Sequence, residues 1–161
     1  MEPRLNYPTI APEPLKLMYA MEKYLGGCGL ERPLIELVKI RASQINGCAY
    51  CLDMHTKDAR AEGETEQRMY ALNAWRETPF YTDRERAALA WTEAVTRIPD
   101  GVPDALYEEA RQHFDEKELA DLTWAVAAIN AWNRVAISFR SVPGTYKPSR
   151  RAQAAAVPAG N

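Results

Sequence analysis

The sequence contains few side chains that react as thiols or bind metals, with three cysteines and two histidines among 161 residues. Three cysteines are too few for the disulfide framework of a small secreted domain, and a chain of this length buries enough surface to fold without cross-links. The sequence also lacks an excess of positive charge, because 20 Lys and Arg stand against 22 Asp and Glu, with both signs mixed. This charge argues against a nucleic-acid partner, since phosphate binding needs a concentrated basic surface.

Long hydrophobic runs are absent as well. The first residues, MEPRLNYPTI, have no apolar core of a signal peptide. Apolar runs such as residues 124–129 are far shorter than the roughly 20 residues that span a bilayer. We therefore expect no membrane association and a cytoplasmic location, where thiols are kept reduced. In that compartment a Cys-x-x-Cys motif is more typical of catalysis or metal binding than of a structural disulfide.

Apolar residues recur at the spacing of helices, and no stretch alternates convincingly as a strand would. The pattern predicts one all-α domain over residues 1–161, a bundle of about seven helices. The helices are expected near residues 14–25, 32–45, 48–61, 65–75, 82–98, 103–114 and 115–139. Closely spaced prolines predict an extended N-terminal arm over residues 1–14, before a helical core over residues 15–140. Residues 141–161 are expected to form a C-terminal tail with little helix.

The last predicted helix contains TWAVAAINAWNRVAISF, which is apolar on nearly every face. Such a helix must be covered on all sides. One chain of this size can just provide that cover, but a subunit interface does so more easily, and the pattern therefore favours a homo-oligomer. The four tryptophans of the chain are expected to pack in its core, as aromatic residues at helical spacing usually do. They are Trp75, Trp91, Trp124 and Trp132.

Two of the three cysteines and one of the two histidines lie within GCAYCLDMH, residues 47–55. The spacing of Cys48, Cys51 and His55 places them within roughly 60° of one another around a helix. Gly47 allows a sharp turn into this helix, so both cysteines lie in its first turn, where free N–H groups and the helix dipole stabilise a thiolate. We expect a reactive thiol, a reversible disulfide across one turn, and a histidine placed to accept or deliver a proton.

Glu36 belongs to the preceding predicted helix. If the two helices form an antiparallel pair around residues 46–47, Glu36 lies about 16 Å along one helix and His55 about 12 Å along the other. The two side chains can then meet directly or through one water. A carboxylate beside an imidazole orients it and raises its basicity. The alternative is a solvated glutamate, which is common on helices.

A metal site is the main alternative for the two cysteines and His55, because three ligands on one face with an open position would suit zinc. Structural zinc sites usually bring two ligand pairs from separate segments, and this sequence has no second Cys/His pair. Purely structural cysteines are the other alternative. Cys28, a single thiol in a predicted turn, is expected to be incidental. Tyr50 is expected to line the thiol pocket, whereas Asp53 and Asp58 are expected on the solvated or dipole-facing side of the helix.

The spacing Glu36-x11-Cys48-x2-Cys51-x3-His55 resembles the alkylhydroperoxidase D-like branch of the carboxymuconolactone decarboxylase family. The stretch ELVKIRASQINGCAYCLDMH, followed by TKDARAEG, carries this resemblance, which extends more loosely over residues 12–146. The resemblance implies an alkylhydroperoxidase D-like helical fold and an oxidoreductase that reduces hydrogen peroxide or organic hydroperoxides. It implies that Cys51 attacks the peroxide and that Cys48 closes the disulfide. His55 and Glu36 would form the proton relay.

The resemblance also implies that the protein needs no haem, flavin or metal cofactor and is re-reduced by a dithiol donor such as a lipoyl or thioredoxin-like protein. It further implies assembly as a homo-trimer or homo-hexamer. This chain has Tyr50 where some family members carry a second histidine, so its relay would be one titrating group shorter. A second function class is therefore a redox sensor or thiol-exchange protein with the same thiols and little peroxidase turnover.

Overall fold

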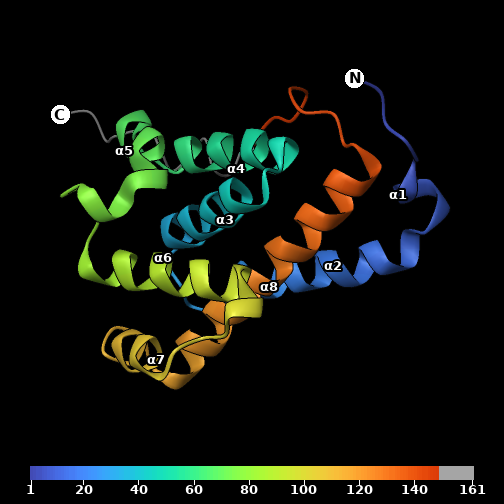
Figure 1. Cartoon of the computed structure of the whole chain (residues 1–161). Coiled ribbons are helices and arrows are strands. Elements are labelled where there is room, and N and C mark those ends of the chain that lie inside the picture. The colour runs from blue at the N-terminus through green and yellow to red at the C-terminus, as the bar shows by residue number, and fades with distance from the viewer. Residues whose placement is uncertain (149–161) are drawn as a thin grey trace.

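The computed structural model describes residues 1–148, and these residues form helices and connecting segments with no strand among them (Figure 1). In chain order the elements are α1 (Tyr7–Ile10), α2 (Pro12–Leu25), α3 (Arg32–Asn46), α4 (Ala49–Ala61), α5 (Glu66–Ala71), the 3-10 helix η1 (Leu72–Glu77), α6 (Asp83–Thr96), the 3-10 helix η2 (Ile98–Asp100), α7 (Asp104–Arg111) and α8 (Glu116–Phe139). The all-α prediction is confirmed. The end of the predicted tail, residues 149–161, lies outside the described residues.

The N-terminal segment differs from the predicted extended arm. Residues Tyr7–Ile10 form the helical turn α1, and α2 already begins at Pro12. Prolines lie in the first turn of both helices, where the backbone N–H groups have no partner within the helix and a missing N–H therefore costs little. The prolines of this segment thus mark two helix starts.

Helix α3 is the central element and packs against α4, α6 and α8 (Figure 1). Because it is surrounded, even its charged residues Glu36 and Lys39 are buried. The largest apolar cluster includes residues of α3, α6 and α8, among them Val38, Trp91 and Val126. A smaller cluster contains both cysteines of the motif together with residues of α3 and α8. The motif therefore lies against the core.

The outer face of α8 is not covered by the core. Trp124 is 54% exposed and Ile137 is 46% exposed, so the prediction that all four tryptophans are buried is wrong for Trp124. Trp75 and Trp91 are buried, and Trp132 is half-buried. Trp124 also lines a groove between α8 and α2. Within residues 1–148, no helix has both the length and the apolar character needed to cross a membrane.

Candidate active site

The two cysteines of the motif lie at the tight turn between α3 and α4. Gly47 ends α3 in the left-handed conformation, with φ 70° and ψ 32°, which residues with a side chain rarely adopt. Cys48 then caps the N-terminus of α4, and its Sγ accepts a hydrogen bond from the backbone N–H of Cys51 at 3.4 Å. The predicted pairing of the cysteines is present as a Cys48–Cys51 disulfide, whereas Cys28 is free and half-buried.

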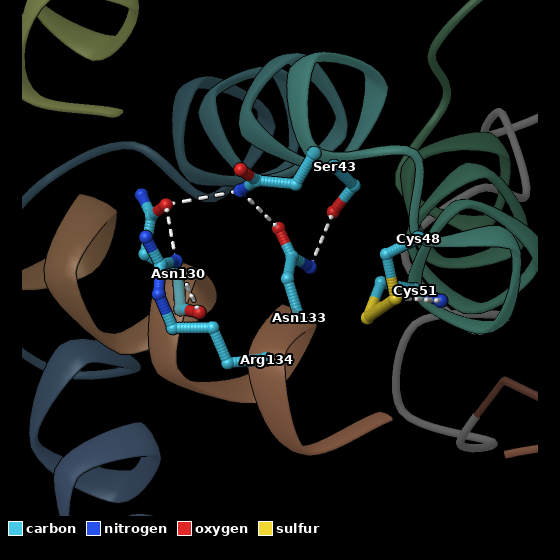
Figure 2. The surroundings of a disulfide bond; sticks show 7 residues. Ser43, Cys48, Cys51, Asn130, Asn133 and Arg134 are labelled. Carbon is cyan, nitrogen blue, oxygen red and sulfur yellow. Dashed lines mark hydrogen bonds between the residues drawn. A yellow bond between two sulfur atoms is a disulfide. The ribbon is translucent and has the colours of Figure 1, made fainter. Parts of the chain in front are cut away.

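Side-chain amides, of which that of Asn133 is fully buried, join this turn to α8, as Figure 2 shows beside the disulfide. The Nδ2 of Asn46 donates to Oδ1 of Asn130 at 2.9 Å and to Oδ1 of Asn133 at 2.8 Å. The Nδ2 of Asn133 donates in turn to the Oγ of Ser43 at 3.1 Å, and the carbonyl of Ser43 accepts the backbone N–H of Cys48. Because buried polar groups destabilise a fold when they are left unpaired, this closed network favours one arrangement of the turn.

His55 lies one helical turn after Cys51 and faces Glu36 of α3. The Nδ1 of His55 lies 2.8 Å from Oε2 of Glu36, and the two residues are 5% and 8% exposed. The predicted meeting of these side chains is confirmed as a direct contact. Because Nδ1 is engaged by the carboxylate, Nε2 is the ring nitrogen left to exchange a proton with reacting atoms.

The carboxyl group of Glu36 is held in its charged form by its surroundings. Burial alone would raise the pKa of Glu36, but the hydrogen bond and charge of His55, together with the charges of Lys39 and Arg32, outweigh burial and lower that pKa. Lys39 is itself paired with Glu22 of α2 at 2.5 Å. Glu36 is therefore suited to orient the imidazole as a carboxylate.

A cavity of about 390 Å³ adjoins this group. Among residues 1–148, Cys51, Glu36 and His55 line the cavity, and Cys48 does not. Tyr50 lines it too, as predicted. The remaining wall is largely aromatic and aliphatic, with contributions from α1, α2, α3, α4 and α8. Its apolar and aromatic members are Tyr7, Tyr19, Leu25, Ile35, Met54, Trp132 and Ala136.

The N-terminal helices close one side of the cavity through aromatic contacts. Tyr7 stacks on Phe139 with ring centroids 5.3 Å apart, and Tyr19 packs on Trp132 at 5.6 Å. The indole N–H of Trp132 donates to Glu22 at 2.9 Å, which fixes the indole relative to α2. A pocket with apolar walls and a few convergent polar groups is the usual form of a small-molecule site.

The expectation that Asp58 lies on the solvated or dipole-facing side of the helix is wrong, because Asp58 is half-buried and lines the cavity together with Cys51 and His55. The sequence carried a usable signal, since Asp58 follows His55 by three positions and Cys51 by seven and so shares their helix face. Tyr146, in the predicted tail, donates its hydroxyl to both carboxylate oxygens of Asp58, at 2.8 and 2.9 Å. Asp53 lies elsewhere on the helix and pairs with Lys57 at 2.9 Å.

Within residues 1–148, the ligand atoms of Glu36, His55 and Asp58 lie within 4.8 Å of one another, close enough to hold a metal ion. This set does not include the cysteines on which the zinc alternative depended. Within this set, Glu36 and His55 are in direct contact. A carboxylate paired with an imidazole in this way orients the histidine for proton transfer.

The fold and the site therefore place the protein in a class of helical proteins whose site combines a pair of cysteines with a carboxylate–histidine pair. Residues 12–94 match the carboxymuconolactone decarboxylase family, and the chain belongs to this family, in its alkylhydroperoxidase D-like branch.

Three relatives illustrate the similarity. The chain is 51% identical over 139 residues to the uncharacterized protein YdfG of Bacillus subtilis (strain 168), covering 86% of this chain and 95% of YdfG. A solved structure, "Protein of Unknown Function ATU0492 from Agrobacterium tumefaciens, Putative Antioxidant Defence Protein AhpD", has a TM-score of 0.87 and 46% identity, covering 90% of this chain and 100% of that chain. An uncharacterized peroxidase-related protein from Silicibacter sp. TM1040 has a TM-score of 0.74 and 28% identity, covering 83% of this chain and 71% of that chain.

Proposed function

We propose that the protein is a thiol-dependent peroxidase that reduces hydrogen peroxide or organic hydroperoxides through its two motif cysteines. The observation that supports this most is the shared cavity, which is lined by Cys51 and by the hydrogen-bonded Glu36–His55 pair. The similarity to a peroxidase-related protein and to an AhpD-type protein supports the same reaction class. The proposed reaction takes place in the cytoplasm and uses no haem, flavin or metal.

In the first step the Cys51 thiolate attacks one oxygen of the hydroperoxide. An S–O bond forms, the O–O bond breaks, and Cys51 becomes a sulfenic acid while the other oxygen leaves as an alkoxide or hydroxide. His55, oriented by Glu36, delivers a proton to that leaving oxygen. The position of Cys51 on the cavity wall supports its role as the attacking residue.

In the second step the Cys48 thiol attacks the sulfenic sulfur of Cys51, water leaves, and the disulfide forms. An external dithiol, such as that of a lipoyl or thioredoxin-like protein, then reduces this disulfide and is itself oxidised to a disulfide. Attack of the donor on Cys51 would release Cys48 as a thiolate. The hydrogen bond from the Cys51 backbone N–H to the Cys48 sulfur would stabilise this leaving group.

We also propose that the protein assembles as a homo-trimer or homo-hexamer. A groove between α2 and α8 supports this proposal. It is lined by Leu17 and Tyr24 of α2 and by Trp124 of α8, which are 74%, 50% and 54% exposed. Large exposed apolar side chains gathered in one place are typical of interaction surfaces, and a second copy of the chain could cover them.

The peroxidase proposal is tested by measuring hydroperoxide consumption with a regenerating dithiol. We expect repeated turnover by the natural protein and by a Cys28→Ser control, and none by Cys51→Ser. Cys48→Ser should stop after one turnover with a sulfenic acid on Cys51, detected by mass spectrometry after trapping with dimedone. If the natural protein consumes one equivalent of peroxide and then stops, whichever dithiol donor is supplied, the result would instead support the redox-sensor function. Equal trapping on Cys48 in Cys51→Ser would reverse the assignment of the cysteines.

A further inference from the structure

Two asparagines interrupt the apolar sequence of α8 where this helix passes the turn between α3 and α4. Asn133 is fully buried and Asn130 is half-buried. Ile129 and Ala136, one turn before and one turn after Asn133, belong to the apolar cluster that contains both motif cysteines. An apolar side chain at position 133 would extend this cluster, whereas a buried amide destabilises the fold unless its hydrogen bonds are made. Whether Asn133 is tolerated here therefore depends on its hydrogen-bond partners.

Asn133 bonds two residues of the last turn of α3. Its Oδ1 accepts a hydrogen bond from Asn46 at 2.8 Å, and its Nδ2 donates to the Oγ of Ser43 at 3.1 Å (Figure 2). The carbonyl of Ser43 accepts the backbone N–H of Cys48 at 3.0 Å. The hydroxyl of Ser43 thus holds it to α8 while its carbonyl holds Cys48. Asn133 is therefore linked to the backbone of Cys48 through a single residue.

Asn130 secures the other side of the same network. Its Oδ1 accepts hydrogen bonds from Asn46 and from Arg134, both at 2.9 Å. Its Nδ2 donates to the Oγ1 of Thr96, at the end of α6, at 3.1 Å. Polar side chains whose partners are all in place make a local structure more rigid. The end of α3, and with it Cys48, is therefore held against α8 and, through Asn130, against α6.

We propose that Asn133 is a positioning residue for Cys48, which it holds where the Cys48 sulfur can close the disulfide with Cys51. The hydrogen bonds of Asn133 are made while the disulfide is closed, so they favour the closed geometry. Holding two reacting groups in place raises the effective concentration of one at the other. A high effective concentration of Cys48 at Cys51 speeds formation of the disulfide and stabilises it against reduction by an external dithiol.

This role lies in the second step of the peroxidase reaction, and in that respect it rests on the proposed function. In this step the Cys48 sulfur attacks the sulfenic sulfur of Cys51. The S–S bond forms as the S–O bond breaks, and the hydroxyl group leaves as water with the proton of the Cys48 thiol. The first step takes place in the cavity, and Asn133 is not among the residues of the described chain that line it. Asn133 should therefore affect the second step and spare the first.

The reduction potential of the disulfide tests the inference without any peroxide. The natural protein and Asn133→Leu, whose new side chain branches in the same way but forms no hydrogen bonds, are equilibrated in dithiothreitol redox buffers. Alkylation and mass spectrometry then measure the reduced fraction of Cys48 and Cys51. We expect the disulfide of Asn133→Leu to be about tenfold easier to reduce, which corresponds to a potential about 30 mV less negative. A purely structural role would destabilise the oxidised and the reduced protein equally, and equal changes cancel in this equilibrium.

Two further variants complete the test, and circular dichroism confirms that each is folded. Asn46→Ala removes the partner of Asn133 at a half-buried position and should shift the potential in the same direction. Thr92→Val is the control, because it removes a fully buried hydrogen bond within α6, outside the network, and should leave the potential unchanged. An unchanged potential in folded Asn133→Leu, or in Asn46→Ala where Asn133→Leu does not fold, would overturn the inference. An equal shift in Thr92→Val would do the same.

The reaction itself gives a second measurement. Stopped-flow oxidation of reduced Asn133→Leu by hydroperoxide should proceed at the rate of the natural protein. The sulfenic acid on Cys51, followed by dimedone trapping, should persist about tenfold longer before the disulfide forms. A slower first oxidation with an unchanged lifetime of the sulfenic acid would contradict the role in the second step. Failure of the natural protein to consume peroxide would overturn only the proposed function, because the redox equilibrium needs no peroxide.

Discussion

At the scale of single residues, Cys48 and Cys51 have different surroundings although they share one helical turn. Both belong to the apolar cluster with Ala42 and Ile129, but Cys51 also lies on the wall of the cavity beside His55, whereas Cys48 caps α4 and does not line the cavity. Both cysteines are 1% exposed, so a reacting molecule must enter the cavity to reach the disulfide. These surroundings support the proposal that Cys51 attacks the substrate and Cys48 closes the disulfide.

The carboxylate–imidazole pair gives a direct prediction for the reaction rate. Replacing His55 by Ala, or Glu36 by Gln, should slow the reaction of the Cys51 thiol with hydroperoxide by about 10²-fold at neutral pH, the usual size of lost general acid–base help. Stopped-flow measurement of the first oxidation gives this rate. Thermal unfolding followed by circular dichroism is the control, and it should change little by comparison. Equal rates in the natural protein and both variants would leave the pair with a packing role.

At the scale of helices, the contacts within one helical pair were predictable from the sequence and the distant contacts were not. The spacing around Gly47 predicted that Glu36 and His55 could meet, directly or through one water, in an antiparallel helical pair, because helix geometry fixes both positions relative to the turn. Tyr146 lies 88 positions from Asp58, and no local pattern indicates that pairing. The exposure of Trp124 could not be predicted either, since an apolar helix does not reveal which of its faces the core covers.

Glu93 joins three helical elements and gives a prediction for acid stability. It accepts hydrogen bonds from Arg41 of α3 and from Trp75 and Arg76 of η1. Burial opposes its charged form, yet the hydrogen bonds from Trp75, Arg76 and Arg41 prevail and lower the pKa of Glu93 below its usual 4.5. A lowered pKa in the folded state stabilises the fold above the unfolded pKa, and this contribution is lost as pH falls through the folded pKa.

We therefore expect Glu93→Gln to unfold more easily than the natural protein at pH 7 but to lose less further stability below about pH 4.5. Urea unfolding between pH 7 and 3 measures both effects. Glu66→Gln, which changes an exposed glutamate on α5, is the control and should follow the natural protein. If the free energy of unfolding falls by the same amount below pH 4.5 in Glu93→Gln and in the natural protein, the role assigned to the Glu93 charge is contradicted.

At the scale of the whole molecule, the groove between α2 and α8, which is lined by apolar side chains together with Lys117 and Asp121, remains uncovered by residues 1–148. It is distinct from the disulfide cavity, because the two share none of their lining residues although both run along α2. A subunit interface there would leave the cavity lining of each chain intact. Closed rotational symmetry would bury the groove of every subunit without leaving an exposed edge.

The predicted trimer or hexamer should have a mass of three or six times 18.2 kDa in light scattering at micromolar concentration. Trp124→Glu should reduce this mass toward that of one chain, because it replaces a large apolar side chain of the groove by a charge, which is costly to bury. Tyr70→Glu is the control, since Tyr70 is 68% exposed and lies outside the groove. A natural protein of 18.2 kDa in solution would contradict the assembly and leave Trp124 exposed in the single chain.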